Sequence, residues 1–221
     1  MSKTVVITGA NRGIGLSFCR QLSMHGLRVF AVCRRPSAEL LQLDVTVIDG
    51  VDVANPEGVA RLVEALSAQA IDLLINNAGI LRNENLGQID YESIEQQFQV
   101  NALGPLRVTE ALIDQLASDA KVAMITSRMG SIADNGSGGR YGYRMSKAAL
   151  NIAAVSLAKD LAPRGIAVGV FHPGLVATEM IGGHGDISPD VAAQRLLARI
   201  DELTLASSGE FVHSNGEPLP W

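Results

Sequence analysis

The chain has 221 residues, of which 47% are hydrophobic and 19% are charged, so it can bury a core and does not have the composition of a disordered protein. Its formal net charge is -5 and it has no basic block, which excludes nucleic acid as an expected partner. No apolar run reaches the roughly 18 residues that cross a membrane, and the first residues do not resemble a signal peptide.

Apolar runs with the length of strands alternate with helical patterns along the chain. In chain order we expect a strand at 3–8, a helix at 13–26, strands at 27–34 and 45–50, a helix at 55–69, a strand at 71–76, a helical segment at 90–117, a strand at 121–127, a helix at 141–161, a strand at 166–173, a helix from 188 and a strand at 209–214. This alternation predicts an α/β fold with a doubly wound parallel sheet. We expect one Rossmann-type domain over 1–221, with about seven strands flanked by helices.

The cysteines and histidines form no metal-binding pattern. Cys19 and Cys33 make no CxxC pair, and the histidines are scattered without an HExxH motif. We therefore expect no metal and no disulfide, and we expect a soluble protein of the reduced cytoplasm.

A glycine-rich loop, TGANRGIG at 8–15, joins the first expected strand to the first helix. Gly9, Gly13 and Gly15 allow the backbone to turn sharply and to approach a ligand, and the following helix N-terminus favours an anion. A tight turn without a ligand would use the same glycines. Because the loop lies between a strand and a helix, we favour a dinucleotide pyrophosphate as its ligand.

The stretch GGRYGYRMSK at 138–147 contains two tyrosines and one lysine. Tyr143 and Lys147 are four residues apart and share a helix face, whereas Tyr141 and Lys147 are six apart and point in different directions. An ammonium beside a tyrosine lowers the tyrosine pKa, so Tyr143 is the candidate acid–base group. Ser127 ends an expected strand at the sheet edge where ligands bind. Its hydroxyl can donate a hydrogen bond to the same ligand oxygen as Tyr143.

The end of the second expected strand indicates which nicotinamide cofactor binds. An acidic residue at this place selects NAD by binding the adenosine ribose, but Cys33 stands here and Arg34 follows it. Arg12 in the glycine loop adds a second cation. Guanidinium groups suit a 2′-phosphate, so we expect NADP(H) rather than NAD(H); ordinary solvated charge is the alternative for Arg34.

Seven motifs in register resemble the short-chain dehydrogenase/reductase family. They are TGANRGIG at 8–15, Asp52-Val53, NNAG at 76–79, Asn101 in VNALG, Ser127 in ITSRMG, Tyr143-x-x-x-Lys147 and HPGLVATEM at 172–180. The region 124–180 is similar to the C-factor-like branch, which includes sniffer-type carbonyl reductases. The resemblance implies hydride transfer between nicotinamide and the carbonyl or alcohol of a small molecule. It also implies that 1–120 mainly serves the cofactor and 121–221 mainly catalysis and substrate.

The resemblance also implies a role for each matching residue. Tyr143 would be the acid/base, Ser127 would orient the carbonyl, Lys147 would bind the nicotinamide ribose and lower the Tyr143 pKa, and Asn101 would join a proton relay through water. The implied cofactor-binding residues are Gly9, Asn11, Arg12, Gly13, Ile14, Gly15, Arg34, Asp52, Val53, Asn77, Ala78, Gly79, Tyr143, Lys147, Pro173, Gly174, Val176 and Thr178.

Several neighbours of these motifs have plainer interpretations. Asp52 alone would equally suit a surface turn and Thr178 a helix N-cap, while Asn76 is expected to bond backbone groups between strands. The loop at 128–140 is expected to form one wall of the substrate pocket, and Tyr141 to line that wall or to pack beneath it. Met180 and Ile181 are candidates for the opposite wall.

Three functions stay open at this point. The first is an NADPH-dependent carbonyl reductase or alcohol dehydrogenase. The second is a C-factor-like nucleotide-binding signalling protein with little or no turnover, which would not need Ser127, Tyr143 and Lys147 together. The third is an epimerase or enoyl reductase on the same scaffold. Family members often pair through helices that match 90–117 and 141–161, so we expect a homo-oligomer, either a dimer or a tetramer.

Overall fold

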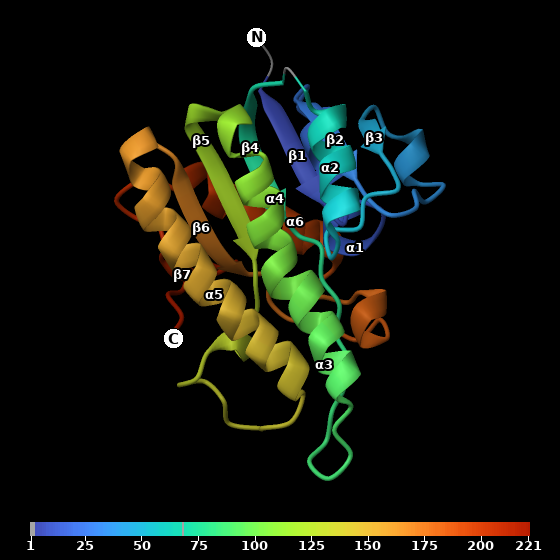
Figure 1. Ribbon diagram of the computed structural model, residues 1–221, viewed down its shortest axis with the longest axis vertical. Helices are drawn as coiled ribbons and strands as arrows, with labels where there is room; N and C mark the ends of the chain where they lie inside the picture. The colour runs from blue at the N-terminus through green and yellow to red at the C-terminus, as the bar shows by residue number, and fades with distance from the viewer. Residues whose placement is uncertain (1–2, 68) are drawn as a thin grey trace.

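Seven parallel strands form one sheet in the computed structural model, which describes residues 3–67 and 69–221 (Figure 1). The strands are β1 Thr4–Thr8, β2 Arg28–Val32, β3 Thr46–Ile48, β4 Ile71–Asn76, β5 Leu116–Ile125, β6 Ala167–His172 and β7 Phe211–His213. They lie in the order β3-β2-β1-β4-β5-β6-β7, and each neighbouring pair is parallel. Because the order reverses between β1 and β4, the predicted doubly wound Rossmann-type sheet is confirmed.

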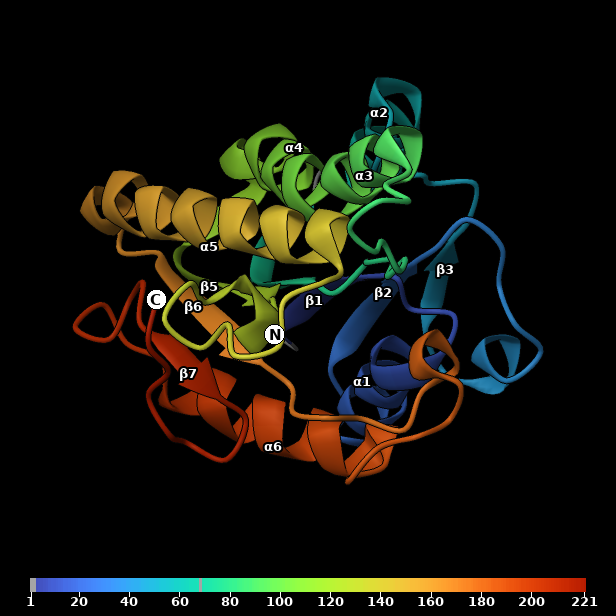
Figure 2. The ribbon, with the colours of Figure 1, turned by 90° about the horizontal axis from the view of Figure 1, so that it is seen from below.

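Helices cover both faces of this sheet. The helices are α1 Gly13–Met24, α2 Pro56–Ala65, α3 Tyr91–Phe98, α4 Gly104–Ala111, α5 Tyr141–Leu161 and α6 Pro189–Glu202. Figure 2 shows α1 and α6 together on one side of the sheet and α2, α3, α4 and α5 on the other. The two layers leave the carboxyl ends of the strands as the edge at which loops gather.

Successive residues of the inner strands enter two different cores, because side chains alternate across a strand. Val6 of β1 packs in the core that contains Leu150 of α5, whereas Val5 packs in the core that contains Phe18 of α1 and Leu196 of α6. Every residue of β1 and β6 is buried. Burial on both faces explains why these strands are unbroken apolar runs in the sequence.

The segment at 90–117 departs most from the sequence-based expectation. It consists of α3, a π-helix at Gln99–Leu103 and α4, and its last residues already belong to β5. Pro105 has no N–H, so the carbonyl of Asn101, four residues earlier, lacks its α-helical donor. A wider π-turn at this point accommodates the missing bond.

The other element ends lie close to those expected. α5 has the expected bounds, and α2 begins after Asn55, whose Oδ1 accepts a 2.8 Å hydrogen bond from the Gly58 N–H. α2 ends at Ala65 rather than at 69, and residue 68 in that expected range lies outside the described residues. Among the described residues, no helix is long and apolar enough to cross a membrane.

Candidate functional site

The carboxyl ends of the strands border a cavity of about 1090 Å³ that extends from β2 and β3 to β6 and β7. This exceeds the usual range for a drug-sized ligand, about 300–1,000 Å³, and suits a dinucleotide with a second small molecule. Apart from Gly15, all the residues expected to bind the cofactor line it: Gly9, Asn11, Arg12, Gly13, Ile14, Arg34, Asp52, Val53, Asn77, Ala78, Gly79, Tyr143, Lys147, Pro173, Gly174, Val176 and Thr178. The predicted residues are therefore brought to one cavity.

The glycine loop packs directly against the chain that follows β4. A Cβ on Gly9 would lie 2.8 Å from the Ala78 Cα, and a Cβ on Gly15 would overlap the Gly9 carbonyl. The Asn77 Nδ2 donates to the carbonyls of Thr8 and Gly9 at 3.1 and 3.2 Å. Gly15 is thus buried behind the loop, where it permits the close packing of α1 and does not line the cavity, and its expected contact with the cofactor stays a prediction.

The structural asparagine of this region is Asn77, not Asn76 as expected. The Asn76 Nδ2 donates to the Thr109 hydroxyl of α4 at 3.0 Å, and its Oδ1 is a buried atom without a hydrogen-bond partner. The backbone bonds between neighbouring strands are instead made by Asn77 and by the Thr8 hydroxyl, which accepts from the Asn77 and Ala78 N–H groups at 3.1 Å. The one-residue shift arises because Asn76 faces the helix layer at the end of β4.

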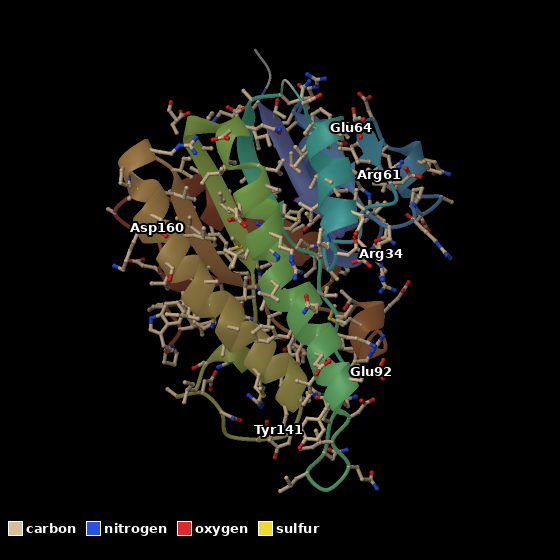
Figure 3. All side chains as sticks on the ribbon, in the orientation of Figure 1. Arg34, Arg61, Glu64, Glu92, Tyr141 and Asp160 are labelled. Atoms are coloured by element: carbon tan, nitrogen blue, oxygen red, sulfur yellow. The ribbon has the colours of Figure 1, made fainter. Side chains whose placement is uncertain are left out.

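Two arginines lie at the end of the cavity beside β2. Arg34 is exposed at the cavity rim, and Figure 3 shows it on the β3 side of the molecule. Arg12 forms an exposed 2.7 Å ion pair with Glu179, and such a surface pair is weak enough to release its arginine to an anion. Cys33 is buried and its pKa is raised by that burial. The glycine cradle and these cations fit a dinucleotide with a phosphate at this end.

The structure supports the expected turn at Asp52 but not a helix N-cap at Thr178. The Asp52 Oδ1 accepts a 2.9 Å bond from the Ala54 N–H, so the carboxylate organises a turn while it also borders the cavity. Thr178 precedes a short helical turn but makes no side-chain cap. Its Cγ2 would be 3.4 Å from a Cβ on Gly13, so the Thr178 side chain lies against the glycine loop.

Tyr143, Lys147 and Ser127 meet at the other end of the cavity. The Lys147 Nζ lies 5.8 Å from the centroid of the Tyr143 ring and donates a 2.9 Å bond to the Ile125 carbonyl. Ser127 follows β5, and its side chain lies close enough to Tyr143 to lower the Tyr143 pKa. All three side chains are buried and line the cavity.

Burial dominates the pKa values of this group. It raises the pKa of Tyr143, against smaller lowering effects of the Ser127 hydrogen bond and the Arg140 charge. It also lowers the pKa of Lys147 to about 8. Burial outweighs the effects that lower the Tyr143 pKa, and the expected lowering by Lys147 stays a prediction.

Asn101 lies behind this group and does not line the cavity. Its Oδ1 accepts from the Ile80 N–H at 2.8 Å, and its Nδ2 donates to the Ile80 carbonyl at 2.8 Å and to the Ser146 hydroxyl at 3.0 Å. These partners occupy the side chain, and the expected role of Asn101 in a proton relay through water stays a prediction.

A family model described as short chain dehydrogenase matches residues 3–186. The chain belongs to the short-chain dehydrogenase family. The predicted family and enzyme class are confirmed by this match.

Two curated relatives agree with this family. The 1-hydroxy-2-glutathionyl-2-methyl-3-butene dehydrogenase of Rhodococcus sp. (strain AD45) is 42% identical over 224 residues, which are 99% of this dehydrogenase and 99% of the relative. The C-signal of Myxococcus xanthus is 45% identical over 154 residues, which are 68% of this chain and 93% of that protein. The expected similarity to a C-factor-like branch is thereby confirmed.

Solved structures resemble this dehydrogenase over its full length. The carbonyl reductase Sniffer of D. melanogaster has a TM-score of 0.92 and 28% identity, covering 100% of each chain. An NADPH-bound carbonyl reductase from chicken fatty liver has a TM-score of 0.89 and 29% identity, covering 100% of this chain and 99% of that one. The sniffer-type resemblance is confirmed as well.

The substrate end of the dehydrogenase cavity contains residues that the sequence did not single out. Arg140 and Met129 line it from the loop at 128–140, while His172 and His213 line it from the ends of β6 and β7. Met180 and Ile181 line it as well, whereas Tyr141 does not. Figure 3 shows Tyr141 at the N-terminal end of α5. No motif marks His213 or Arg140, since only the fold brings them here.

Proposed function

We propose that this dehydrogenase transfers a hydride between NADP(H) and the carbonyl or alcohol carbon of a small molecule. The observation that carries the proposal is the pairing of Ser127, Tyr143 and Lys147 at one end of a single cavity with Arg12 and Arg34 at the other. The NADPH named for the chicken carbonyl reductase supports the choice of cofactor. When bound, NADPH supplies the hydride.

The residues of the chain would handle the proton. Tyr143 is neutral at physiological pH because burial raises its pKa, so it can protonate the alkoxide that a reduced carbonyl becomes. The Ser127 hydroxyl lies next to it and can donate to the same oxygen, which stabilises the developing negative charge. Lys147, one helical turn after Tyr143, would hold the ribose and attract the phenolate that remains.

Arg34 and Arg12 would bind the 2′-phosphate, and Asp52 with Val53 the adenine. The segment Asn77–Gly79 would pass beneath the adenosine ribose. The residues Pro173, Gly174, Val176 and Thr178 would border the nicotinamide end. In this proposal 1–120 forms mainly the cofactor half of one domain and 121–221 mainly the catalytic half.

The test measures NADPH oxidation against a panel of aldehydes, ketones, diketones and quinones, with Tyr143→Phe and Tyr141→Phe as a matched pair. We expect Tyr143→Phe to lose at least about a hundredfold in kcat, the usual effect of a lost general acid, and Tyr141→Phe to keep most activity because Tyr141 does not line the cavity. Loss in Tyr141→Phe alone would contradict the assignment.

A second candidate is oxidation of an alcohol that carries a glutathionyl group, the activity named for the Rhodococcus relative. The match over 99% of both chains supports it. Reduction of NADP⁺ with such a conjugate tests it. A protein that binds NADPH and turns over none of these compounds would instead fit the signalling alternative that the C-signal relative raises, and product analysis would detect epimerase or enoyl reductase chemistry.

We also propose that the protein acts in the cytoplasm as a homo-oligomer that pairs through α5. Met145 and Ile152 are seven residues apart on α5, so they share a face, and they are 53% and 65% exposed. Such an apolar stripe suits a dimer or tetramer interface. Light scattering during size exclusion measures the mass, and a monomer at micromolar concentration would rule the proposal out.

A further inference from the structure

Arg140 has an unusual backbone conformation directly before the helix of Tyr143. Its φ is 51°, the one positive value among the non-glycine residues that the structure describes, and it follows Gly138 and Gly139 at 61° and 62°. Side chains with a Cβ rarely adopt this left-handed region. Such residues persist where the surroundings impose them, and they gather at binding sites.

The surroundings of Arg140 hold it firmly in this conformation. Its N–H donates to the Glu84 carbonyl at 3.0 Å, and its Nε donates to the Asn83 Oδ1 at 3.1 Å. The Glu84 carboxylate is itself buried and accepts from the Gly142 N–H at 3.1 Å and the Ser93 hydroxyl at 3.0 Å. Arg140 is thus tied to the loop at 81–90 and to the start of α5.

The charge of Arg140 is not neutralised by this arrangement. Its guanidinium contacts the Asn83 amide oxygen and the Met129 sulfur, which are neutral groups. Within the described part of the chain, Arg140 belongs to no ion pair, whereas Arg128 on the same loop forms a 2.7 Å pair with Asp134. The loop wall of the cavity therefore has one unmatched positive charge, at Arg140.

This charge faces the reaction centre. Arg140 lines the same cavity as Ser127 and Tyr143, and it lies near enough to Tyr143 to lower its pKa. Arg140 lies directly before α5, and Tyr143 lies in the first turn of that helix. A small molecule could therefore contact both side chains at once, with its carbonyl at Tyr143 and another group at Arg140.

We propose that Arg140 is a specificity-determining residue that binds a carboxylate on the substrate, so that the enzyme prefers carbonyl compounds bearing an anionic group over neutral ones. A guanidinium presents a planar pair of donors that matches a carboxylate. The proposal rests on the proposed function of the cavity, and it adds the chemical class of the substrate.

Two aldehydes that differ in charge test this proposal. The probes are 4-carboxybenzaldehyde and its methyl ester, and the variant is Arg140→Asn, because asparagine is among the side chains that tolerate a left-handed backbone. We expect kcat/KM for the acid to fall about tenfold or more, mainly through KM, as for a lost charge-assisted hydrogen bond. The ester should change less than about twofold.

A matched control removes an arginine from the same end of the molecule. Arg82→Gln deletes an exposed arginine that does not line the cavity, and both aldehydes should behave as with the parent. If Arg140→Asn does not fold, Arg140→Gly, which also suits the backbone, should show the same selective loss. Equal losses for acid and ester, or no loss for the acid, would overturn the proposal.

Binding separates this proposal from the proposed function. If the parent reduces neither aldehyde, the panel of carbonyl compounds decides about the proposed function, and calorimetry with 4-carboxybenzyl alcohol and its methyl ester on the NADP⁺-loaded protein decides about Arg140. Tighter binding of the acid that is lost in Arg140→Asn supports the carboxylate site. Equal affinities in the parent, or no measurable binding of the acid, would reject it.

Discussion

At the residue scale, burial shifts the pKa values of Tyr143 and Lys147 in opposite directions. Burial favours the neutral form of each, so it raises the pKa of the phenol and lowers the pKa of the ammonium to about 8. Tyr143 therefore keeps its proton, and it lies beside a lysine whose pKa is about 8. The helix spacing that brings them together was readable in the sequence, but their burial was not.

The shifted lysine makes stability depend on pH. The pKa of Lys147 is 10.5 ordinarily and about 8 in the fold, so between these values the unfolded chain binds the proton and the native chain does not. The native state is therefore penalised below pH 8, and the penalty disappears as pH rises towards 10.5. Relative to Lys147→Met, the parent should gain about 3 kcal/mol across this window.

Urea unfolding of both proteins at a series of pH values measures this difference. Tyr143 ionises above pH 10 in the unfolded chain and lowers stability there, but it is present in both proteins and largely cancels. Parallel stability curves would mean that the Lys147 pKa is not lowered in the fold.

At the element scale, the break between α3 and α4 decides how the site is supported. A continuous α-helix over 90–117 would need a backbone N–H at position 105, and Pro105 has none. The side chain of Asn101 then holds the backbone of Ile80 through both its N–H and its carbonyl. Proline in a helical pattern was visible in the sequence, but only the tertiary partners reveal what the break does.

Removal of this amide should destabilise the protein measurably. Asn101→Ala leaves the N–H and carbonyl of Ile80 without partners, and we expect the free energy of unfolding to fall by about 2 to 3 kcal/mol. Gln96→Ala on the exposed side of α3 is the control and should stay within about 0.5 kcal/mol of the parent. Denaturant unfolding of the three proteins checks this, and an unchanged Asn101→Ala would show that the loop at Ile80 holds by other contacts.

At the scale of the whole molecule, one cavity connects the proposed phosphate-binding site with the proposed catalytic site, which lie at different ends of the sheet. The β2 and β3 end presents Arg34, and the β5 and β6 end presents Tyr143. We expect Arg34→Ala to raise KM for NADPH about tenfold while KM for NADH changes little, because only the former cofactor carries the phosphate.

Arg61→Ala provides the control for this prediction. Arg61 is exposed near Arg34 in Figure 3, but it pairs with Asp49 and does not line the cavity. Steady-state kinetics with both cofactors measures the change in preference. An equal rise of KM for NADPH and NADH in Arg34→Ala would contradict the phosphate assignment.

The sequence predicted the seven strands and α5, and it predicted the cofactor-binding residues, all but Gly15 of which line the cavity, because these follow local periodicity and the order of motifs. It did not predict that β5 starts at Leu116 or that Asn77 rather than Asn76 joins the strands, since both depend on pairing with distant chain. The left-handed Arg140 and the buried Glu84 beside it depend on contacts between three separate segments. Residues of that kind carry no local signal.

The close packing of Gly15 against the Gly9 carbonyl changes what the glycine motif can report. In a mutational library selected only for soluble expression, and without cofactor in the medium, Gly15 should tolerate substitution as poorly as a buried leucine does. A relative that had lost its catalytic activity would therefore still keep the glycine motif. In such a relative Ser127, Tyr143 and Lys147 could be substituted without loss of solubility. These three positions therefore distinguish an active reductase from an inactive one.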